Sequence, residues 1–221
     1  METRQVRRIT HAIYIGLLAA MSAAGETPSF ENDYGRADIG KPWESMLASQ
    51  GLAGWHASEA PFSPSVWRRE GDAIIADTGQ ATRGRLVQGD GTWAAYEFKV
   101  QATIQKGFIG PQLVFGISDD GASSHFLTYL AGWKSMVIVR RNEETHEDVK
   151  LDVVDFVMDP GREYDIVLKV RDHSVTSYVD GVLVNRLTLP GEARGAVGLA
   201  VWANNSVIRF RDPKIRHYYK R

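Results

Sequence analysis

Glu97 is the carboxylate that the sequence positions best for acid–base chemistry. It lies within residues 96–104, where apolar and polar residues alternate without a break, and this alternation predicts a long, rigid strand. Retaining glycoside hydrolysis needs two carboxyl groups held about 5 Å apart, and no second carboxylate has a position that the spacing fixes. Lys99 follows two residues later and shares the face of Glu97. Glu97 is therefore the candidate catalytic residue, with a surface ion pair to Lys99 as the alternative interpretation.

A second group of residues has the chemistry of a sugar-binding site. Sugars are held by aromatic rings against their apolar side and by amide, hydroxyl or charged groups that fix their hydroxyls. The candidate ligand-binding residues are His125 and Tyr129 on one predicted strand, Trp133 in the next turn, Arg140 on the following strand, and Trp202 with Asn204 at the end of the last glycine-rich strand. If they converge at one rim, they form a carbohydrate site.

These residues also have a purely structural interpretation. In that interpretation Trp133 caps the sandwich and Trp202 packs against the N-terminal strap at residues 26–41. Arg140 and Arg141 are then the charges with which an edge strand blocks association between sheets.

Other reactive groups are scarce. The chain has no cysteine, which excludes disulfides, thiolate catalysis and cysteine zinc sites. It has no G-x-S-x-G, P-loop or H-E-x-x-H motif and its six histidines are scattered, so no cofactor or histidine metal site is expected. Asp119 and Asp120, before Gly121, could give oxygens to a calcium ion, but D-D-G is first of all a turn sequence.

Strands must position these side chains. Residues 164–170, 175–179 and 182–184 alternate as three antiparallel strands, and Asp180 with Gly181 supplies a two-residue turn between the last two. About a dozen such short strands, with turn signals roughly every 8 to 12 residues, predict an all-β, antiparallel two-sheet jelly-roll sandwich. The predicted core residues are Tyr96, Phe98, Val100, Ile166, Leu168, Val170, Val197, Leu199 and Val201.

The last of the glycine-rich strands, residues 195–203, has two different faces. Val197, Leu199 and Val201 make one face, and Gly198, Ala200 and Trp202 make the other. Small residues beside one tryptophan indicate a surface that something approaches closely.

The N-terminus carries the features of an export signal. Three arginines precede an apolar, uncharged run at residues 12–24, which ends in small residues suited to cleavage. Residues 1–25 are therefore expected to be a signal peptide or, alternatively, a membrane anchor, with the protein exported to the periplasm or the extracellular space. The rest of the chain is expected to comprise a polar linker or surface strap at residues 26–41, the jelly-roll domain at residues 42–217 and a basic tail at residues 218–221.

Size and charge limit the number of domains and the partners. With 221 residues, of which 43% are hydrophobic, the chain can bury one sizeable core. Its formal net charge of -1 provides no basic excess, so a nucleic-acid partner is not expected.

A family resemblance rests on strand and turn motifs that cover about residues 43–217. The motifs are G-L-x-G-W at residues 51–55, W-x-x-E-G-D-A-I-I at 67–75, Y-E-F-K-V at 96–100, Y-D-I-V-L-K-V at 164–170, V-D-G-V-L-V at 179–184 and G-x-V-G-L-x-V at 195–201. In this order they resemble the 3-keto-disaccharide hydrolase domain family, one of the concanavalin A-like lectin/glucanase jelly rolls. Residues 207–216 resemble the closing strand of those domains.

The chain departs from that family where catalysis is concerned. Members usually carry a G-N-S-G turn after the central strand, whereas residues 105–111 here read Q-K-G-F-I-G-P. Glucanases of the same fold carry E-x-D-x-x-E on one strand face, whereas residues 143–148 read E-E-T-H-E-D, with the right residue types at the wrong spacing. This acidic run lies between two predicted strands and is interpreted as a solvated hairpin loop.

Three functions remain open. The first is an exported, non-catalytic carbohydrate-recognising module with a glycan as its partner. The second, which the resemblance implies, is a hydrolase acting on 3-keto-disaccharides or other glycosides. The third is a structural accessory subunit of a membrane-bound complex, joined through a retained N-terminal segment.

Overall fold

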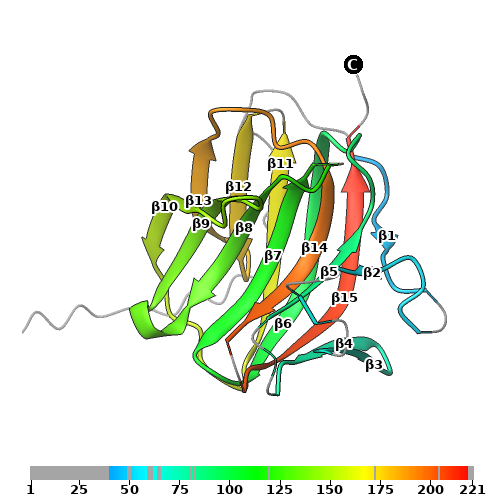
Figure 1. Cartoon of the computed structure of the whole chain (residues 1–221), viewed down its shortest axis with the longest axis vertical. Coiled ribbons are helices and arrows are strands. Elements are labelled where there is room, and N and C mark those ends of the chain that lie inside the picture. Colours follow the sequence, from blue (N-terminus) through cyan, green and yellow to red (C-terminus); the bar gives the residue numbers. More distant parts are fainter. Residues whose placement is uncertain are drawn as a thin grey trace, which may run out of the picture.

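The computed structural model describes residues 40–48, 51–58, 62–63, 66–79, 81, 83–118, 120–171, 173–203 and 205–218. In these ranges the chain forms two antiparallel sheets packed face to face (Figure 1). We name them after their central strands. The β6 sheet has the order β13-β12-β11-β6-β15-β4-β3, with β1 beside β15, and the β7 sheet has the order β10-β9-β8-β7-β14-β5-β2.

The strands of the β6 sheet are β1 (Glu44–Ser45), β3 (Trp67–Glu70), β4 (Ala73–Asp77), β6 (Ala95–Lys106), β11 (Glu163–Arg171), β12 (Ser174–Val179), β13 (Val182–Thr188) and β15 (Val207–His217). Those of the β7 sheet are β2 (His56–Ala57), β5 (Arg83–Gln88), β7 (Ile109–Ile117), β8 (Ser123–Leu130), β9 (Ser135–Asn142), β10 (Asp148–Asp155) and β14 (Ala196–Trp202). A short 3-10 helix, η2 (Ala131–Trp133), joins β8 to β9. The predicted all-β sandwich is therefore confirmed.

The inner faces of the two sheets build one main core. All nine core residues predicted from the alternation lie in it, and each is at most 1% exposed. Pairing between β11 and β6 sets Ile166 opposite Val100 and Leu168 opposite Phe98, so large apolar side chains meet in register. Burial of each such side chain contributes about 1.5–3 kcal/mol.

The outer face of the β7 sheet is unusual because much of it is buried. Val114 is 0% exposed, and Gln112 and Ala200 are 2% exposed, although all three point away from the main core. Arg85 of β5 and Glu143, which follows β9, approach to 2.5 Å across three intervening strands. Four strand spacings in a flat sheet would span about 19 Å, so the sheet must curl.

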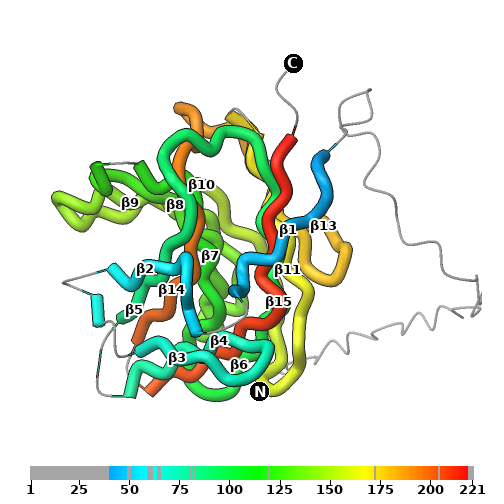
Figure 2. Tube along the Cα trace, turned by 90° about the vertical axis from the view of Figure 1, so that its right-hand side faces the viewer, coloured from blue at the N-terminus to red at the C-terminus, as the bar shows by residue number. Residues whose placement is uncertain are grey.

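The curl makes this outer face concave. In Figure 2 the β8–β9 and β2–β5 flanks both project beyond the central strands β7 and β14, toward the left of the view. A second apolar cluster forms the floor, made by Val114, Ile117, Phe126, Ala196 and Ala200. We refer to this surface of the β7 sheet as the concave face.

The first described residues run along β15. Gly40 pairs with Tyr218, the amide of Lys41 donates to the carbonyl of His217 (2.8 Å), and β1 continues the contact. Tyr218, which the sequence analysis assigns to the basic tail, is thus part of the sheet and is 8% exposed. The predicted signal or anchor at residues 1–25 and nearly all of the predicted strap lie outside the described residues. Within the described ranges, no helix has the length and apolarity needed to cross a membrane.

Candidate functional site

Trp202 is the aromatic centre of the concave face. It lies at the end of β14 on the face shared with Gly198 and Ala200, as the alternation predicted. Its ring is parallel to that of Phe126, with an angle of 13° and 6.2 Å between centroids. The indole is partly exposed. The ring is therefore fixed beside Phe126, with part of its surface open to solvent.

Arginines surround this ring. The guanidinium carbon of Arg141 lies 4.5 Å from the Trp202 ring centroid, and that of Arg83 lies 6.0 Å away. Arg83 and Arg85 also lie over the ring of Phe62, at 5.8 and 4.3 Å. Cations over aromatic faces are attracted by the ring quadrupole, so these contacts hold both rings and guanidiniums in place.

Glu143 joins the two flanks of the concave face. Its carboxylate accepts hydrogen bonds from Arg85 (2.5 Å) and from the hydroxyl of Ser124 (2.6 Å), and Arg141 Nε lies 3.3 Å away. The side chain is only 13% exposed. The expectation that residues 143–148 form a solvated loop is therefore wrong for Glu143, because the curl of the sheet folds this residue onto β5.

A second carboxylate contacts the same arginine. Asp148 Oδ1 lies 3.3 Å from Nη1 of Arg141. Partial burial raises the pKa of Asp148 above its ordinary value and the charge of Glu143 adds to the rise, while Arg141 opposes it. The carboxyl groups of Glu143 and Asp148, which lie in different environments, therefore both contact the guanidinium of Arg141.

The strand pattern explains how these residues come to face the same side. In β5, Arg83, Arg85 and Val87 alternate with core-facing residues, and the register sets Arg83 beside Trp202 and Arg85 beside Ala200. The R-x-R pair at the start of this strand was a usable signal. The pair is absent from the predicted site, because nothing in the spacing relates β5 to β9.

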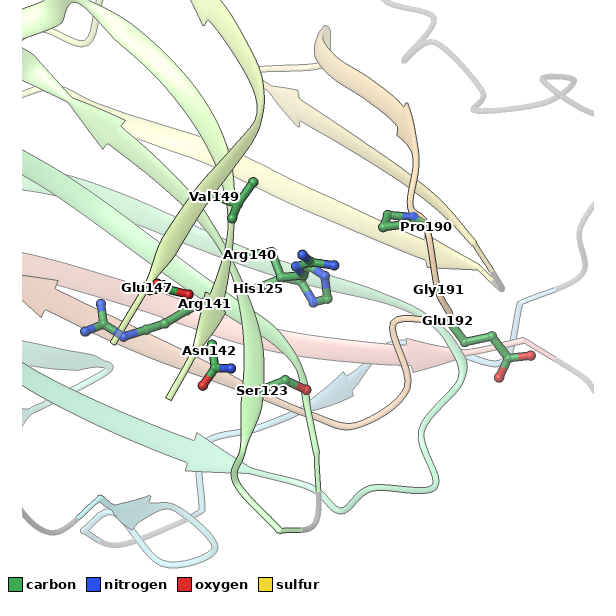
Figure 3. A pocket seen from close by; sticks show the side chains of 10 residues that line it. All are labelled: Ser123, His125, Arg140, Arg141, Asn142, Glu147, Val149, Pro190, Gly191 and Glu192. Carbon is green, nitrogen blue, oxygen red and sulfur yellow. The ribbon is translucent and has the colours of Figure 1, made fainter. Parts of the chain in front are cut away.

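His125 and Arg140 lie on the opposite face of the β7 sheet from Trp202. They are direct cross-strand neighbours of β8 and β9 and line a pocket of about 380 Å³ at one end of the sandwich. Figure 3 shows both side chains directed toward the loop of Pro190 and Gly191, whereas Arg141 points the other way. The single rim expected for these residues and Trp202 is therefore wrong, since successive strand residues point to opposite faces.

Burial sets the state of His125. The residue is 8% exposed and its ring stacks on Phe115 with 5.1 Å between centroids. Burial, helped by the charge of Arg140, lowers the pKa of His125 to about 4. The imidazole is therefore neutral near pH 7, and its Nδ1 atom has no hydrogen-bond partner among the described residues.

The other predicted ligand residues are dispersed. Tyr129 is 2% exposed and belongs to the main core, where the alternation that places it with Leu127 also buries it. Trp133 follows the far end of β8, is 61% exposed, and has Lys150 Nζ 3.6 Å from its ring centroid. Asn204 lies outside the described residues.

Arg140 and Arg141 do not protect a sheet edge. Strand β9 is paired with β10 on one side and with β8 on the other. Arg141 is only 4% exposed. The edge-strand interpretation is therefore wrong.

Glu97 lies on the outer face of the β6 sheet, away from both groups. It is 4% exposed, and Arg216 donates to Oε2 through Nε (2.9 Å) and Nη2 (2.5 Å). The hydroxyl of Tyr218 donates to Oε1. The alternative pairing with Lys99 is wrong, because Lys99 shares the face but binds Asp165 at 2.7 Å. Glu97 thus ties the C-terminal strand to the sheet.

The expected calcium candidates are only partly described. Asp119 lies outside the described residues. Asp120 accepts a hydrogen bond from the amide of Ala122 (2.9 Å), as a turn residue does, and its hydrogen bond with Ser118 lowers its pKa. In the described ranges, no three His, Cys, Asp or Glu side chains are grouped so that they could hold a metal ion.

The two packed antiparallel sheets form an all-β sandwich with the concanavalin A-like fold. The carbohydrate-binding module CBM66 from Bacillus subtilis superposes with a TM-score of 0.60 at 15% identity, covering 72% of this chain and 93% of the module. The β-glucanase of Bacillus licheniformis superposes with a TM-score of 0.58 at 12% identity, covering 84% of this chain and all of the glucanase. The fold is therefore one that carbohydrate-binding modules and glycoside hydrolases share.

Part of the chain is similar in sequence to part of a much longer enzyme. The chain is 32% identical over 112 residues to an extracellular exo-α-L-arabinofuranosidase of Streptomyces chartreusis. The matched stretch is 50% of this chain and 13% of that enzyme. No protein-family model matches the chain.

Proposed function

We propose that this chain is an exported carbohydrate-recognising module that binds a glycan on its concave face. The observation that carries the proposal is the partly exposed Trp202 ring, held parallel to Phe126 and bordered by Arg83 and Arg141. An aromatic platform beside fixed polar groups is the usual chemistry of sugar recognition. Because the ring and its neighbours already contact one another, little ordering is needed on binding.

The comparisons support this proposal from two sides. The fold is shared with a carbohydrate-binding module, and the sequence match is to a small part of an extracellular glycosidase. A binding module that is attached to such an enzyme, or derived from one, would have both this fold and this partial sequence match. Export follows from the predicted signal or anchor at residues 1–25.

The test is glycan binding by the full chain and by two matched variants. Trp202→Ala should weaken binding to the best glycan on an array by about 10-fold or more, since the stacking platform is lost. Trp133→Ala, which removes an exposed tryptophan at the far end of β8, should bind like the unmodified protein. Silence of the unmodified protein on the array, or equal losses in both variants, would overturn the proposal.

Hydrolysis is the second candidate, and the pair of Glu143 and Asp148 favours it. Both carboxylates contact Arg141 on the concave face, and the raised pKa of Asp148 suits a proton donor. The family resemblance makes 3-keto-glycosides the first substrates to try. Binding is preferred to hydrolysis because Glu143 is already held by Arg85, Arg141 and Ser124 and is not open to a substrate.

Reducing-end release from 3-keto-glycosides and β-glucans distinguishes the two functions. If the protein is a binding module, neither substrate class is turned over. Turnover that disappears in Glu143→Gln or Asp148→Asn but survives in Glu97→Gln would establish the hydrolase instead. Turnover that disappears only in Glu97→Gln would point to the outer face of the β6 sheet.

A further inference from the structure

The end pocket is separate from the concave face. Its lining comes from β8, β9, β10, the hairpin between β9 and β10 and the loop between β13 and β14. Arg141 belongs to the lining as well, but its side chain points to the opposite face of the β7 sheet, where it meets Trp202, so the sheet lies between Trp202 and the His125 and Arg140 side chains. Its volume of about 380 Å³ lies within the range of about 300–1,000 Å³ that is usual for small-molecule sites. A ligand there would occupy a second site, whatever binds on the concave face.

His125 is the first sign that this pocket accepts a ligand. A buried polar atom without a hydrogen-bond partner is costly, and native structures contain few of them. Nδ1 of His125 is such an atom, on a residue that is 92% buried and lines the pocket (Figure 3). Because the ring is neutral, one nitrogen can donate and the other can accept, which suits a hydroxyl group.

Arg140 is the second sign. Its guanidinium lies beside His125, and its side chain has no ion-pair or hydrogen-bond partner within the described part of the chain. A guanidinium presents parallel N–H donors that match a planar carboxylate. The pocket therefore provides a site for one carboxylate next to a site for one hydroxyl.

The remaining lining defines the rest of the ligand. Ser123 and Asn142 add uncharged donors and acceptors, and Val149 with Pro190 adds apolar surface that can cover the carbon–hydrogen face of a ring. Glu147 and Glu192 also line the pocket, and Glu192 is paired with Arg194. Figure 3 shows the Glu192 side chain directed away from Arg140 and the Glu147 side chain beside Arg141, so neither carboxylate neutralises the Arg140 guanidinium.

We propose that the end pocket binds a single sugar-acid unit, a hydroxylated ring with one carboxylate, in which Arg140 holds the carboxylate and His125 binds an adjacent hydroxyl. The site is independent of the concave face. It selects a hexuronate over the neutral hexose, because the hexose has no carboxylate for Arg140, and over inorganic phosphate, because phosphate has no ring to lie against Val149 and Pro190.

Calorimetric titration of the full chain tests the proposal with three probes, D-glucuronate, D-glucose and inorganic phosphate. Glucuronate should bind saturably, and glucose and phosphate should each bind at least about 10-fold more weakly, as expected for the loss of one charge-assisted bidentate contact. The proposal is overturned if glucuronate does not bind, or if glucose or phosphate binds as well.

Variants then locate the site. Arg140→Gln is a safe change because the side chain is exposed, and it should weaken glucuronate binding by about 10-fold or more. Arg68→Gln, a change at an exposed arginine of the other sheet, should leave binding unchanged, as should Trp202→Ala. Loss of glucuronate binding in Trp202→Ala with retention in Arg140→Gln would assign the sugar acid to the concave face and refute the second site.

Discussion

The buried His125 makes the stability of the fold depend on pH. Burial first, and then the nearby charge of Arg140, lowers its pKa to about 4 from an ordinary value of 6.5. In the unfolded chain the imidazole takes up a proton as the pH falls through 6.5, whereas in the folded chain it does so only near pH 4. The unfolded state therefore binds more protons in this window, and the free energy of unfolding must fall with the pH.

We predict that His125→Gln reduces the acid sensitivity of the fold. The shift from 6.5 to about 4 corresponds to a loss of about 3 kcal/mol between pH 7 and pH 4 in the unmodified protein. The variant lacks this loss, so its free energy of unfolding should change less over the same range. Urea denaturation at several pH values measures the difference, and His56→Gln, at an exposed histidine, is the matched control. An unchanged pH dependence in His125→Gln would contradict the assigned burial.

The hairpin of β12 and β13 shows how local sequence determines an element. Asp180 and Gly181 have φ angles of 50° and 76°, in the left-handed region that a two-residue hairpin turn requires. Asp180 Oδ1 also accepts a hydrogen bond from the amide of Asp165 (2.9 Å), which ties the turn to β11. The register of three strands therefore depends on two turn residues.

We predict that Gly181→Ala destabilises the protein by about 1–2 kcal/mol, the cost of a side chain in the left-handed region. No atom lies within 4 Å of the added Cβ, so the effect comes from the backbone alone. Gly132→Ala is the matched control, because that position is equally open but does not have a left-handed φ angle. Thermal unfolding of the two variants should separate them, and equal midpoints would show that the turn tolerates alanine.

Strand positions, turn residues and the main core could be predicted from the sequence because each depends on alternation within a few residues. The same alternation also predicts, strand by strand, that His125 and Tyr129 face the core and that Trp202 faces outward. The order of strands across the sheet could not be read in this way. Without that order, the two faces could not be related, and a single rim was expected.

At the scale of the whole molecule, curvature decides which residues meet. The twist that each strand contributes accumulates over seven strands, and no short pattern in the sequence records the sum. It brings Arg85 to Glu143 and turns an acidic hairpin into one wall of a concave face. Gly198 allows β14 and β5 to approach closely in the curled sheet, because a Cβ at this position would lie 2.6 Å from the carbonyl oxygen of Leu86 on the neighbouring strand.

The Arg85–Glu143 pair should therefore stabilise the curled form of the β7 sheet, and a double-mutant cycle can measure this. Both side chains are largely buried, at 11% and 13% exposed. Glu143→Gln leaves the buried Arg85 guanidinium without its carboxylate, so it should cost about 3 kcal/mol or more. Arg85→Gln should cost less, because Arg141 and Ser124 still contact Glu143. The double variant should recover part of the loss, with a coupling energy of about 0.5–3 kcal/mol.

The control cycle uses Arg194 and Glu192, an ion pair of the same residue types whose side chains are 59% and 42% exposed. Solvent screens such a pair, so its coupling should be close to zero. Of the two pairs, only Arg85–Glu143 spans the concave face, so only its rupture should also change glycan affinity. Equal coupling in the two cycles would mean that the contact across the face does not hold the curl, and the concave site would then have to be maintained by the Trp202 and Phe126 contacts instead.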